Sequence, residues 1–425
     1  MTTTPSRPIT AWPGLHTLPT GFKAEASSRI ARRLFHAAVR SLPVSVHEGE
    51  RTYGAGGPSM TIVRPDEFFA RLGRDGLIGF GESYMTKAWE AEDLGGFLTV
   101  LAADLPTLIP APLQKLRAAY VRRPPRHQKN HEHNTRDNIS HHYDLSNDLF
   151  RVFLDETLSY SSALYDTSVI DRGDHLVAAP PESQDAEPLA DAQIRKIERL
   201  LDEAHVGQGT RVLEIGTGWG ELAICAARRG ATVHSVTLST EQLELAEQRI
   251  AEAGYSDQVR VELSDYRAVQ GTYDAVVSVE MIEAVGYEFW STYFRTIDRV
   301  LAPGGRVGIQ AITMQHERML ATRRTWTWIN KYIFPGGLLP SVTAVDEITR
   351  ADTSLRLSGR LSFGQHYAET LARWDHAFLA NSQEVRDLGF DEIFERMWHF
   401  YLEYSRAGFA SGYIDVQQLT LTREG

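Results

Sequence analysis

One segment constrains the fold of this 425-residue chain more than any other. Aliphatic residues lead from Val212 to Ile215, glycines follow at Gly216, Gly218 and Gly220, and a helical pattern then runs from residue 221 to residue 229. Glycine lets the backbone approach a ligand without a Cβ clash, and the first turn of the following helix offers unpaired N–H groups. The segment therefore predicts a strand, a tight turn and a helix that surround a small ligand.

The next expected strand, Thr232 to Leu238, helps to identify that ligand. A dinucleotide site usually has Asp or Glu at the end of this strand to bind a ribose hydroxyl, whereas Ser239 follows Leu238 here. Glu221 and Leu222, rather than a further glycine, follow the glycine loop, and no dedicated phosphate lysine is present. A nucleoside without a pyrophosphate fits this pattern better than a dinucleotide.

Alternating strands and helices continue beyond the loop. This rhythm predicts an α/β fold with a doubly wound parallel sheet and a ligand at the carboxyl ends of its strands. We expect strands at 211–215, 232–238, 259–263, 275–279 and 306–312, and helices at 221–229, 240–253 and 288–300.

The domain organisation follows from shifts in composition. Residues 1–20 are polar and proline-containing and are expected to be a disordered tail. A small domain is expected over 21–120, followed by a basic linker over 121–136. The catalytic domain then covers 137–425, with a substrate-binding insertion at about 314–374 where the regular rhythm breaks.

Charge is unevenly distributed along the chain. Residues 1–130 hold 17 Lys and Arg against 11 Asp and Glu, so the remainder holds 27 against 44. The first part is thus +6 and the rest −17, which favours an anionic partner for the first part. A predicted helix from Ser28 to Arg40 places Ile30, Leu34 and Ala38 on one face. It could lie in a lipid interface or pack on its own domain, and the sequence leaves both open.

The sequence also indicates the cellular compartment and whether a metal site is expected. A single cysteine, Cys225, excludes an intrachain disulfide, and no signal peptide or uninterrupted membrane-spanning segment is visible. We therefore expect a cytoplasmic protein that contacts the inner membrane surface. No metal is expected, because the histidines have no neighbouring cysteine to complete a zinc site. These histidines are His127, His131, His133, His141 and His142.

Several separated motifs resemble those of the cyclopropane-fatty-acid synthases and their mycolic-acid and methylene-forming relatives. The motifs are Gly79–Met85, His141–Phe150, Leu158–Ala163, the glycine loop, Ser235–Ser239 with Gln242, Ser278–Gly286, and His366–Leu371 with Trp374. The resemblance implies a Rossmann-like class I S-adenosylmethionine-dependent methyltransferase domain with a smaller N-terminal domain. It also implies cofactor contacts from Tyr143, Tyr160, Glu214, Gly216, Gly218, Gly220, Thr237, Gln242, Asp265 and Tyr266.

The resemblance also implies a catalytic cluster. An alkene in an acyl chain is a poor nucleophile, so it must be held against a sulfonium methyl where water cannot quench the resulting cation. The family is understood to use a bound bicarbonate as the general base. Glu283, the backbone of Ile312 and Tyr367 match the family's bicarbonate cluster, whereas Ser162 replaces its usual Cys and Gln310 its usual His. Both replacements retain hydrogen-bonding capacity, so bicarbonate stays compatible with this set.

Three segments look most like the branch that makes 10-methylene fatty acids, the precursors of tuberculostearic acid: Gln310–Met314, Val279–Gly286 and Lys331–Gly337. Cyclopropane formation is the alternative. The small N-terminal domain resembles one found in synthases that act on intact phospholipids, which implies a membrane phospholipid substrate and peripheral membrane association. A reductase partner that saturates the methylene group is implied by resemblance alone, and a homodimer stays open.

Two other classes of function were weighed. The basic N-terminal part could bind nucleic acid, with the fold methylating RNA, but Cys225 lies in the wrong helix for a catalytic cysteine, so no nucleic-acid partner is expected. The chain could also bind the cofactor without catalysis, because Ser162 and Gln310 replace the usual pair. Turnover with an oleoyl phospholipid separates the enzyme from a binding protein. The aromatic residues Trp326, Trp328, Tyr332 and Phe334 fit a core, a tunnel wall or a membrane-facing edge equally well.

Overall fold

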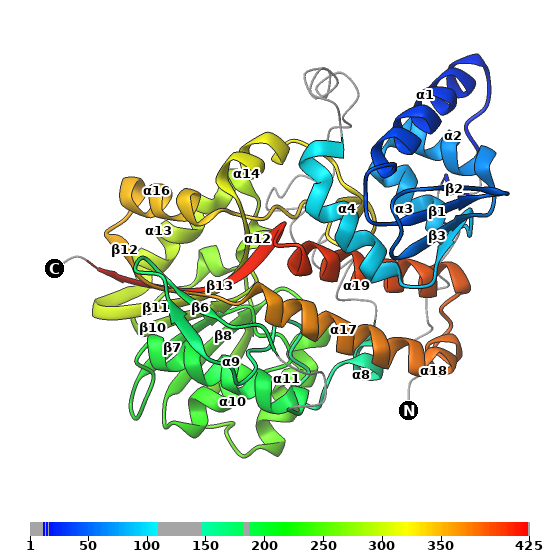
Figure 1. The fold of residues 1–425 in the computed structure, drawn as a ribbon. Helices are drawn as coiled ribbons and strands as arrows, with labels where there is room; N and C mark the ends of the chain where they lie inside the picture. The colour runs from blue at the N-terminus through cyan, green and yellow to red at the C-terminus, as the bar shows by residue number, and fades with distance from the viewer. Residues whose placement is uncertain (1–11, 13, 16, 109–145, 182–186, 424–425) are drawn as a thin grey trace. The chain divides into compact units, whose positions relative to one another are not determined.

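The computed structural model describes residues 12, 14–15, 17–108, 146–181 and 187–423. The chain divides into two compact units (Figure 1). The first unit comprises Met1–Arg123, Thr325–Ile333 and Leu371–Ser411, and the second comprises Pro124–Arg324, Phe334–Thr370 and Gly412–Gly425. The sequence did not predict this discontinuous division, in which two later segments group with the N-terminal part. The predicted linker, the tyrosine at 143 and the five histidines considered for zinc lie outside the described residues, as does most of the predicted tail.

The second unit is built on one sheet, whose described strands follow the order β5-β6-β12-β13-β11-β10-β7-β8-β9. The strands from β11 to β9 run parallel, and β13 is antiparallel to both β11 and β12. The strand bounds are β5 Val169–Asp171, β6 Leu176–Ala178, β7 Arg211–Ile215, β8 Thr232–Thr237, β9 Val259–Leu263, β10 Tyr273–Val279, β11 Leu301–Met314, β12 Leu355–Ser362 and β13 Ile414–Arg423.

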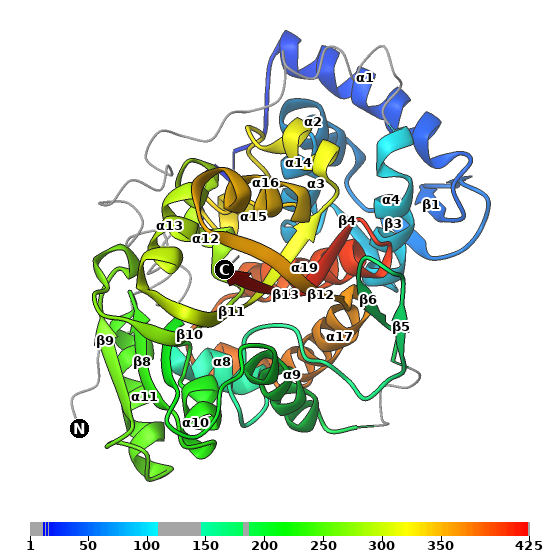
Figure 2. The same cartoon turned by 90° about the vertical axis from the view of Figure 1, so that its left-hand side faces the viewer.

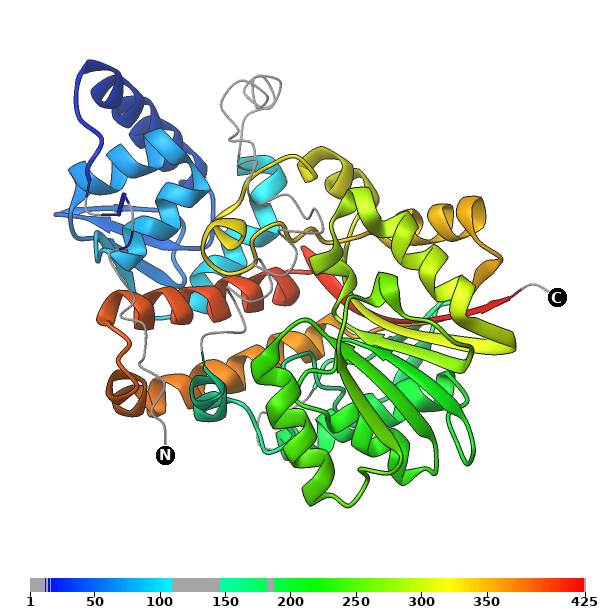
Figure 3. The same ribbon diagram turned by 180° about the vertical axis from the view of Figure 1, so that it is seen from behind.

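Helices cover both faces of this sheet (Figures 2 and 3). Successive strand residues alternate between two cores: Val212 packs with α9, α10 and α11, and Leu213 packs with α13 and α16. This alternation explains why the strands are apolar on both sides. The helices of this unit are α8 Asn147–Phe153, α9 Leu189–Glu203, α10 Glu221–Arg228, α11 Thr240–Glu252, η2 Tyr266–Ala268, α12 Ile282–Val285, η3 Tyr287–Phe289, α13 Trp290–Val300, α14 His316–Thr322, α16 Val342–Asp352 and the first part of α17 Gly364–Ala380.

The predicted strands and helices around the glycine loop are confirmed. β7 and β9 have the predicted bounds, and α10 and α11 each end one residue earlier than predicted. β8 ends one residue earlier than predicted and β10 begins two residues earlier. The helix expected from residue 288 begins at Trp290, after the short 3-10 turn η3. The strand expected over 306–312 is longer at both ends, since Leu301 of β11 pairs with Tyr273 of β10 and the pairing with β13 continues to Met314.

The first unit combines a small sheet with helices. Its described strands follow the order β2-β1-β3-β4. Helix α19 contacts α3 and α4, so a helix near the C-terminus packs on N-terminal elements within this unit. The elements are α1 Phe22–Val39, β1 Ser45–Glu48, β2 Arg51–Tyr53, β3 Ser59–Ile62, α2 Pro65–Asp75, α3 Leu77–Met85, β4 Trp89–Ala91, α4 Leu94–Leu108, α15 Trp328–Tyr332, α18 Ser382–Asp387 and α19 Glu392–Ala410, with the end of α17.

Two glycines of α3 explain the motif at Gly79–Met85. A Cβ on Gly79 would lie 2.0 Å from the carbonyl oxygen of Arg71, and one on Gly81 would lie 2.6 Å from the Trp328 indole. The indole is buried and packs at 4.8 Å, edge to face, against Phe400. Trp328 is therefore a core residue of the first unit, which decides between the three roles that the sequence left open for it.

The described helices include no segment that is both long enough and apolar enough to cross a bilayer.

Candidate functional site

A cavity lies at the carboxyl ends of β7, β8 and β10, within the second unit. The chain leaves β7 toward β8 on one side and returns to β10 on the other, so the cavity occupies the switch point where open α/β sheets bind ligands. Its lining includes seven of the residues predicted to contact the cofactor. These are Tyr160, Glu214, Gly216, Gly218, Thr237, Gln242 and Tyr266.

The glycine loop owes its shape to backbone conformations that other residues rarely adopt. Gly216, Gly218 and Gly220 have φ angles of 97°, 53° and 91°. A Cβ on Gly216 would lie 2.4 Å from Cγ of Met281, whereas one on Gly218 would meet no protein atom within 4 Å. The backbone of the loop therefore lies directly against Met281 at Gly216 and faces open space in the cavity at Gly218.

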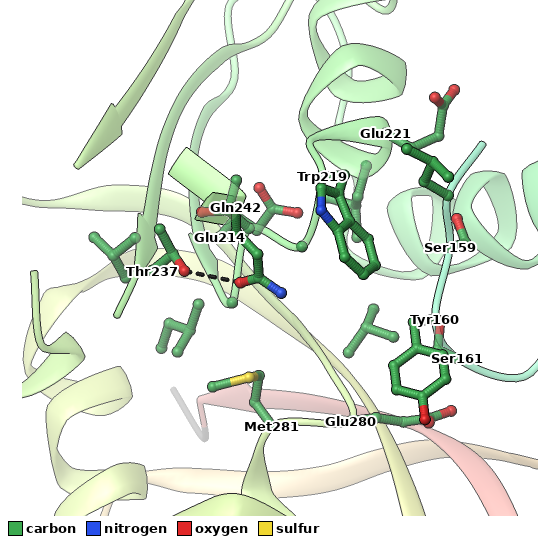
Figure 4. Close-up of a pocket in the computed structure, with 18 of the residues that line it drawn as sticks. Ser159, Tyr160, Ser161, Glu214, Trp219, Glu221, Thr237, Gln242, Glu280 and Met281 are labelled. Atoms are coloured by element: carbon green, nitrogen blue, oxygen red, sulfur yellow. Dashed lines mark hydrogen bonds between the residues drawn. The ribbon is translucent and has the colours of Figure 1, made fainter. Parts of the chain in front are cut away.

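Polar side chains at the cavity are joined by hydrogen bonds, of which Figure 4 shows the one between Thr237 and Gln242. The Ser235 hydroxyl donates to Glu214 Oε2 at 2.5 Å and lies 2.7 Å from the Thr217 hydroxyl. The Thr237 hydroxyl donates to Gln242 Oε1 at 3.0 Å. In the view of Figure 4, Glu280 and Met281 lie across the cavity from Glu214 and Gln242. These groups offer hydrogen-bond partners suited to the hydroxyls and amino group of a nucleoside.

Burial raises the pKa of Glu214 to about 8, and the hydrogen bond from Ser235 only partly offsets this. Between the ordinary value of 4.5 and this value, the folded protein holds a proton that the unfolded chain has lost, so the free energy of unfolding falls as pH rises. We expect Glu214→Gln to be nearly neutral at about pH 4, below the ordinary pKa, and to stabilise the cofactor-free protein by at least about 1 kcal/mol at about pH 8. Thermal unfolding of parent and variant at both pH values measures this, and parallel pH profiles would contradict it.

Two of the predicted cofactor residues, Asp265 and Gly220, are not among the residues that line the cavity, and a third lies outside the described residues. Asp265 is not among the lining residues, and its carboxylate accepts hydrogen bonds from the backbone and the guanidinium of Arg267. Gly220 caps the N-terminus of α10. A Cβ added to Gly220 would lie 3.3 Å from the Ala246 side chain, so glycine at this position allows α10 and α11 to pack closely. Tyr143 lies outside the described residues.

The sequence analysis missed Trp219, Lys196, Met281 and Glu280, all of which line the cavity. Trp219 is fixed by a 2.8 Å hydrogen bond from its indole nitrogen to Asn147 Oδ1. A signal existed for Glu280, since it directly follows a buried strand at the carboxyl edge of the sheet.

A buried polar cluster adjoins the cavity and is centred on Glu280. Its Oε1 accepts hydrogen bonds from the Ser162 backbone N–H at 3.0 Å and from Gln310 Nε2 at 2.9 Å. Its Oε2 accepts one from the Tyr367 hydroxyl at 2.8 Å. The structure therefore brings the predicted residues Ser162, Gln310 and Tyr367 together, around a carboxylate that the sequence analysis had not singled out.

Helix α17 holds the segment that carries Ser162. The Tyr165 backbone N–H donates to His366 Nδ1 at 2.9 Å, and the Ala163 N–H donates to the Thr370 hydroxyl at 3.2 Å. His366 Nε2 lies 2.8 Å from the Ala179 carbonyl oxygen, and burial lowers the pKa of the imidazole to about 4. A neutral imidazole accepts at one nitrogen and donates at the other, so His366 positions the chain and does not supply charge.

Glu283 and Ile312 are paired as the resemblance implied. The Ile312 N–H donates to Glu283 Oε1 at 2.5 Å, and Glu283 Oε2 is buried with no hydrogen-bond partner among the described residues. Burial, together with the nearby charge of Glu280, raises the pKa of Glu283 to about 8. Glu283 is not among the residues that line the cavity.

Lys196 places a positive charge close to the cluster. Its side chain is buried, and its Nζ donates to the Ser161 hydroxyl at 2.7 Å. Burial lowers the pKa of this ammonium to about 8, with the negative charge of Glu280 opposing the shift. An ammonium here favours the ionised form of Glu280.

The chain matches known proteins over most of its length. Residues 130–419 match the family model described as mycolic acid cyclopropane synthetase. The chain is 51% identical to tuberculostearic acid methyltransferase UfaA1 of Mycobacterium tuberculosis, over 99% of this chain and 98% of that protein. It is 33% identical to the cyclopropane-fatty-acyl-phospholipid synthase of Escherichia coli K12, over 86% of this chain and 88% of that protein.

Two solved structures, one of them from Mycobacterium tuberculosis, share the fold. The cyclopropane synthase MmaA2 aligns with a TM-score of 0.59 at 30% identity, over 67% of this chain and 97% of that one. The mycolic acid cyclopropane synthase CmaA1, complexed with SAH and CTAB, aligns with a TM-score of 0.59 at 31% identity, over 69% and 98%. The predicted class I methyltransferase fold and the dependence on S-adenosylmethionine are confirmed.

Proposed function

The chain belongs to the mycolic acid cyclopropane synthetase family, and from that membership we propose that it methylates the double bond of an oleoyl-type chain in a membrane phospholipid. The product is a 10-methylene acyl chain, the precursor of tuberculostearic acid. One observation carries the proposal: a cofactor cavity at the switch point of the sheet is bordered by a buried cluster of acids and their hydrogen-bond donors. A methyl transfer that passes through a cation needs a cavity for the methyl donor and, next to it, a group that can accept a proton.

When bound, S-adenosylmethionine supplies an electrophilic methyl group. The glycine loop and Glu214, Gln242 and Tyr266 fit this cofactor, because they present bare backbone, hydrogen-bonding oxygens and an aromatic ring to one cavity. Ile197, Val279 and Met281 add apolar walls. These walls exclude water, which would otherwise capture the cation.

The chemistry of the two candidate products differs after the first step. The alkene π electrons would form a new bond to the methyl carbon as its bond to the sulfonium sulfur breaks, with that electron pair left on sulfur. A cation is then left on the neighbouring carbon. In the proposed pathway, a hydride moves from the methylated carbon to that neighbour, so the cation lies on the methyl-bearing carbon. Loss of a proton from the methyl group then leaves its C–H electron pair as an exocyclic double bond. Cyclopropane formation loses a proton from the same methyl group without the hydride shift.

The relatives favour the methylene product. Identity to the tuberculostearic acid methyltransferase is 51% over nearly the whole chain, against 33% over 86% of it for the cyclopropane-fatty-acyl-phospholipid synthase. A cyclopropane product is the second candidate, because the match to that synthase covers 86% of this chain and 88% of that protein.

Incubation of the purified protein with S-adenosylmethionine and dioleoyl phospholipid vesicles tests the proposal. The two products are isomers of equal mass, so proton NMR of the extracted lipid is the readout. Olefinic signals of an exocyclic methylene are expected. High-field ring signals instead would establish the cyclopropane alternative, and recovery of unmodified lipid would support a binding protein without catalysis.

Helix α1 supports docking on a membrane surface. Phe22, Ile30 and Leu34 on this helix are 85%, 60% and 38% exposed, although all three are large and apolar. Lys23, Arg29 and Arg33 are also exposed, and Glu25 is the one acid within the helix. Exposed apolar residues interspersed with basic ones are typical of a helix that lies in an anionic lipid interface. A reductase that saturates the methylene group belongs to the proposal only through the resemblance to the family.

If α1 docks on the membrane, mutation of its exposed apolar residues must weaken binding to vesicles. We expect Ile30→Asp with Leu34→Asp to weaken binding to vesicles containing anionic phospholipid at least about 10-fold, because two apolar contacts are lost and negative charge is added. Vesicle co-sedimentation measures the affinity. Glu25→Gln on the same helix is the control and should bind at least as well as the parent. Equal affinity of the parent for neutral and anionic vesicles would contradict electrostatic docking.

A further inference from the structure

We propose that Glu280 is the proton acceptor of this reaction, so that a carboxylate of the chain itself takes the place of bound bicarbonate. This inference rests on the proposed function. Glu280 directly follows β10 and borders the cofactor cavity together with Met281. The backbone φ angle of Glu280 is 52°, a value that residues other than glycine rarely adopt. Such strain in a non-glycine residue at a cavity is a common mark of a functional position.

The surroundings of Glu280 are built to hold a carboxylate. Donors reach it from three separate segments: the Ser162 backbone, Gln310 on β11 and Tyr367 on α17. Gln418 Nε2 donates to Gln310 Oε1 at 3.2 Å, which turns the amino group of Gln310 toward Glu280. Gln418 itself is fixed by donating to the Lys196 carbonyl oxygen at 2.9 Å. The orientation of the donors is therefore determined by a second layer of hydrogen bonds.

The same contacts leave no suitable place for bicarbonate among these residues. The Gln310 amino group and the Tyr367 hydroxyl, which were expected to bind the anion, donate to Glu280 instead. The Ser162 hydroxyl donates to the Ala163 carbonyl oxygen at 3.0 Å. A bicarbonate held by this set would also lie beside an ionised carboxylate, and like charges in a buried site repel strongly. The predicted residues thus do not fit the anion that the resemblance implied.

The two acids of the cluster have different environments. Glu280 receives three hydrogen bonds and lies near the Lys196 ammonium, whereas only backbone groups donate to Glu283. The negative charge of one acid disfavours ionisation of the other. Burial raises the pKa of both carboxyls, and the three hydrogen bonds and Lys196 oppose that rise at Glu280. On this difference in surroundings, Glu280 is assigned as the ionised member of the pair and Glu283 as the neutral one. Because Glu280 borders the cavity and Glu283 does not, the charged carboxylate is also the one with access to substrate.

The proton transfer balances without another reactant. A C–H bond of the transferred methyl group breaks, and its electron pair forms the new carbon–carbon bond of the product. The proton passes to a carboxylate oxygen of Glu280, which becomes a neutral carboxylic acid. The proton is released to water after the product leaves, so each turnover yields one proton and one S-adenosylhomocysteine.

The test combines a variant with a bicarbonate-depleted assay on oleoyl phospholipid vesicles. We expect the parent to keep full activity when bicarbonate is removed from degassed buffer. Glu280→Gln should lower kcat at least about 100-fold, the range of a lost general base, while the Kd for S-adenosylmethionine in calorimetry changes less than about threefold. Glu288→Gln, at an exposed position outside the cluster, is the control and should match the parent.

Several outcomes would overturn the inference. A parent enzyme that needs added bicarbonate, or a Glu280→Gln variant within about threefold of the parent kcat, excludes Glu280 as the base. The bicarbonate arm uses the parent alone, so it decides the question even if the variant fails to fold. If the parent gives no methylated lipid, the proposed function itself fails. If parent and variant both give methylated lipid, at rates within about threefold of each other, only the role of Glu280 fails.

Discussion

Gly216→Ala is expected to lower the affinity for S-adenosylmethionine at least about 100-fold and to reduce methyl transfer accordingly. The φ angle of 97° at this position costs an alanine on the order of 1–3 kcal/mol. The new methyl group would also lie 2.4 Å from Cγ of Met281, an atom near the backbone that cannot move aside as the tip of a side chain can. The loop must therefore shift away from the position that shapes the cavity. Calorimetric titration with the cofactor measures the loss.

Two further variants separate the causes of this effect. Gly254→Ala has a similar φ of 81°, but an added Cβ meets no atom within 4 Å, so it should cost stability without changing cofactor affinity. Gly216→Ala combined with Met281→Ala removes the clash and should recover part of the affinity. If Gly216→Ala binds the cofactor as tightly as the parent, the close approach of the loop to Met281 has no importance for the site.

Glu82→Gln is expected to destabilise the first unit by about 3 kcal/mol, because it removes the negative charge from a buried ionic network. Glu82 is 1% exposed and forms ion pairs with Arg71, Arg74 and Lys331. It also accepts a hydrogen bond from the Tyr332 hydroxyl at 2.9 Å. Arg71 is itself only 2% exposed, so its guanidinium would lose a neighbouring charge in a place that water does not reach. Urea denaturation followed by tryptophan fluorescence measures the midpoint shift.

The control for this variant is Glu392→Gln, which breaks the surface ion pair with Lys87 in the same unit. Both partners of that pair are substantially exposed, at 67% and 46%, so no measurable change in the midpoint is expected. Equal midpoints for the Glu82 variant and the parent would mean that the network around Glu82 contributes nothing to the stability of the unit.

The cofactor side of the site could be predicted from sequence because its determinants are local. The strand, the glycine turn and the helix start of residues 211–229 follow one another without interruption, and each is encoded by its own residues. The prediction of Thr237 and Gln242 as cofactor residues likewise depended on one strand and the helix that follows it. In the structure these two side chains share a hydrogen bond. Asp265 shows the limit of this reasoning. Its position after β9 led to the prediction of a cofactor contact, whereas its carboxylate accepts hydrogen bonds from the neighbouring Arg267 in the structure.

The catalytic side depends on contacts between segments far apart in the chain. Ser162 and Glu280 are 118 positions apart, and Tyr367 and Glu280 are 87 apart, so no local pattern reports that they meet. The motif containing both Glu280 and Glu283 was visible in the sequence, and only Glu283 was singled out, because the resemblance pointed to it. Which acid receives the donors depends on where β11 and α17 place Gln310 and Tyr367.

By itself, the sequence determined the strand–loop–helix order, the two-sided apolar sheet and the nucleoside cavity at its carboxyl edge, because periodicity and glycine positions act over a few residues. The tertiary structure alone decided that segments 325–333 and 371–411 group with the N-terminal part, that Trp328 lies in a core, and that Glu280 is the centre of the polar cluster. These outcomes depend on burial and on hydrogen bonds between distant segments, and both quantities exist only once the chain has folded.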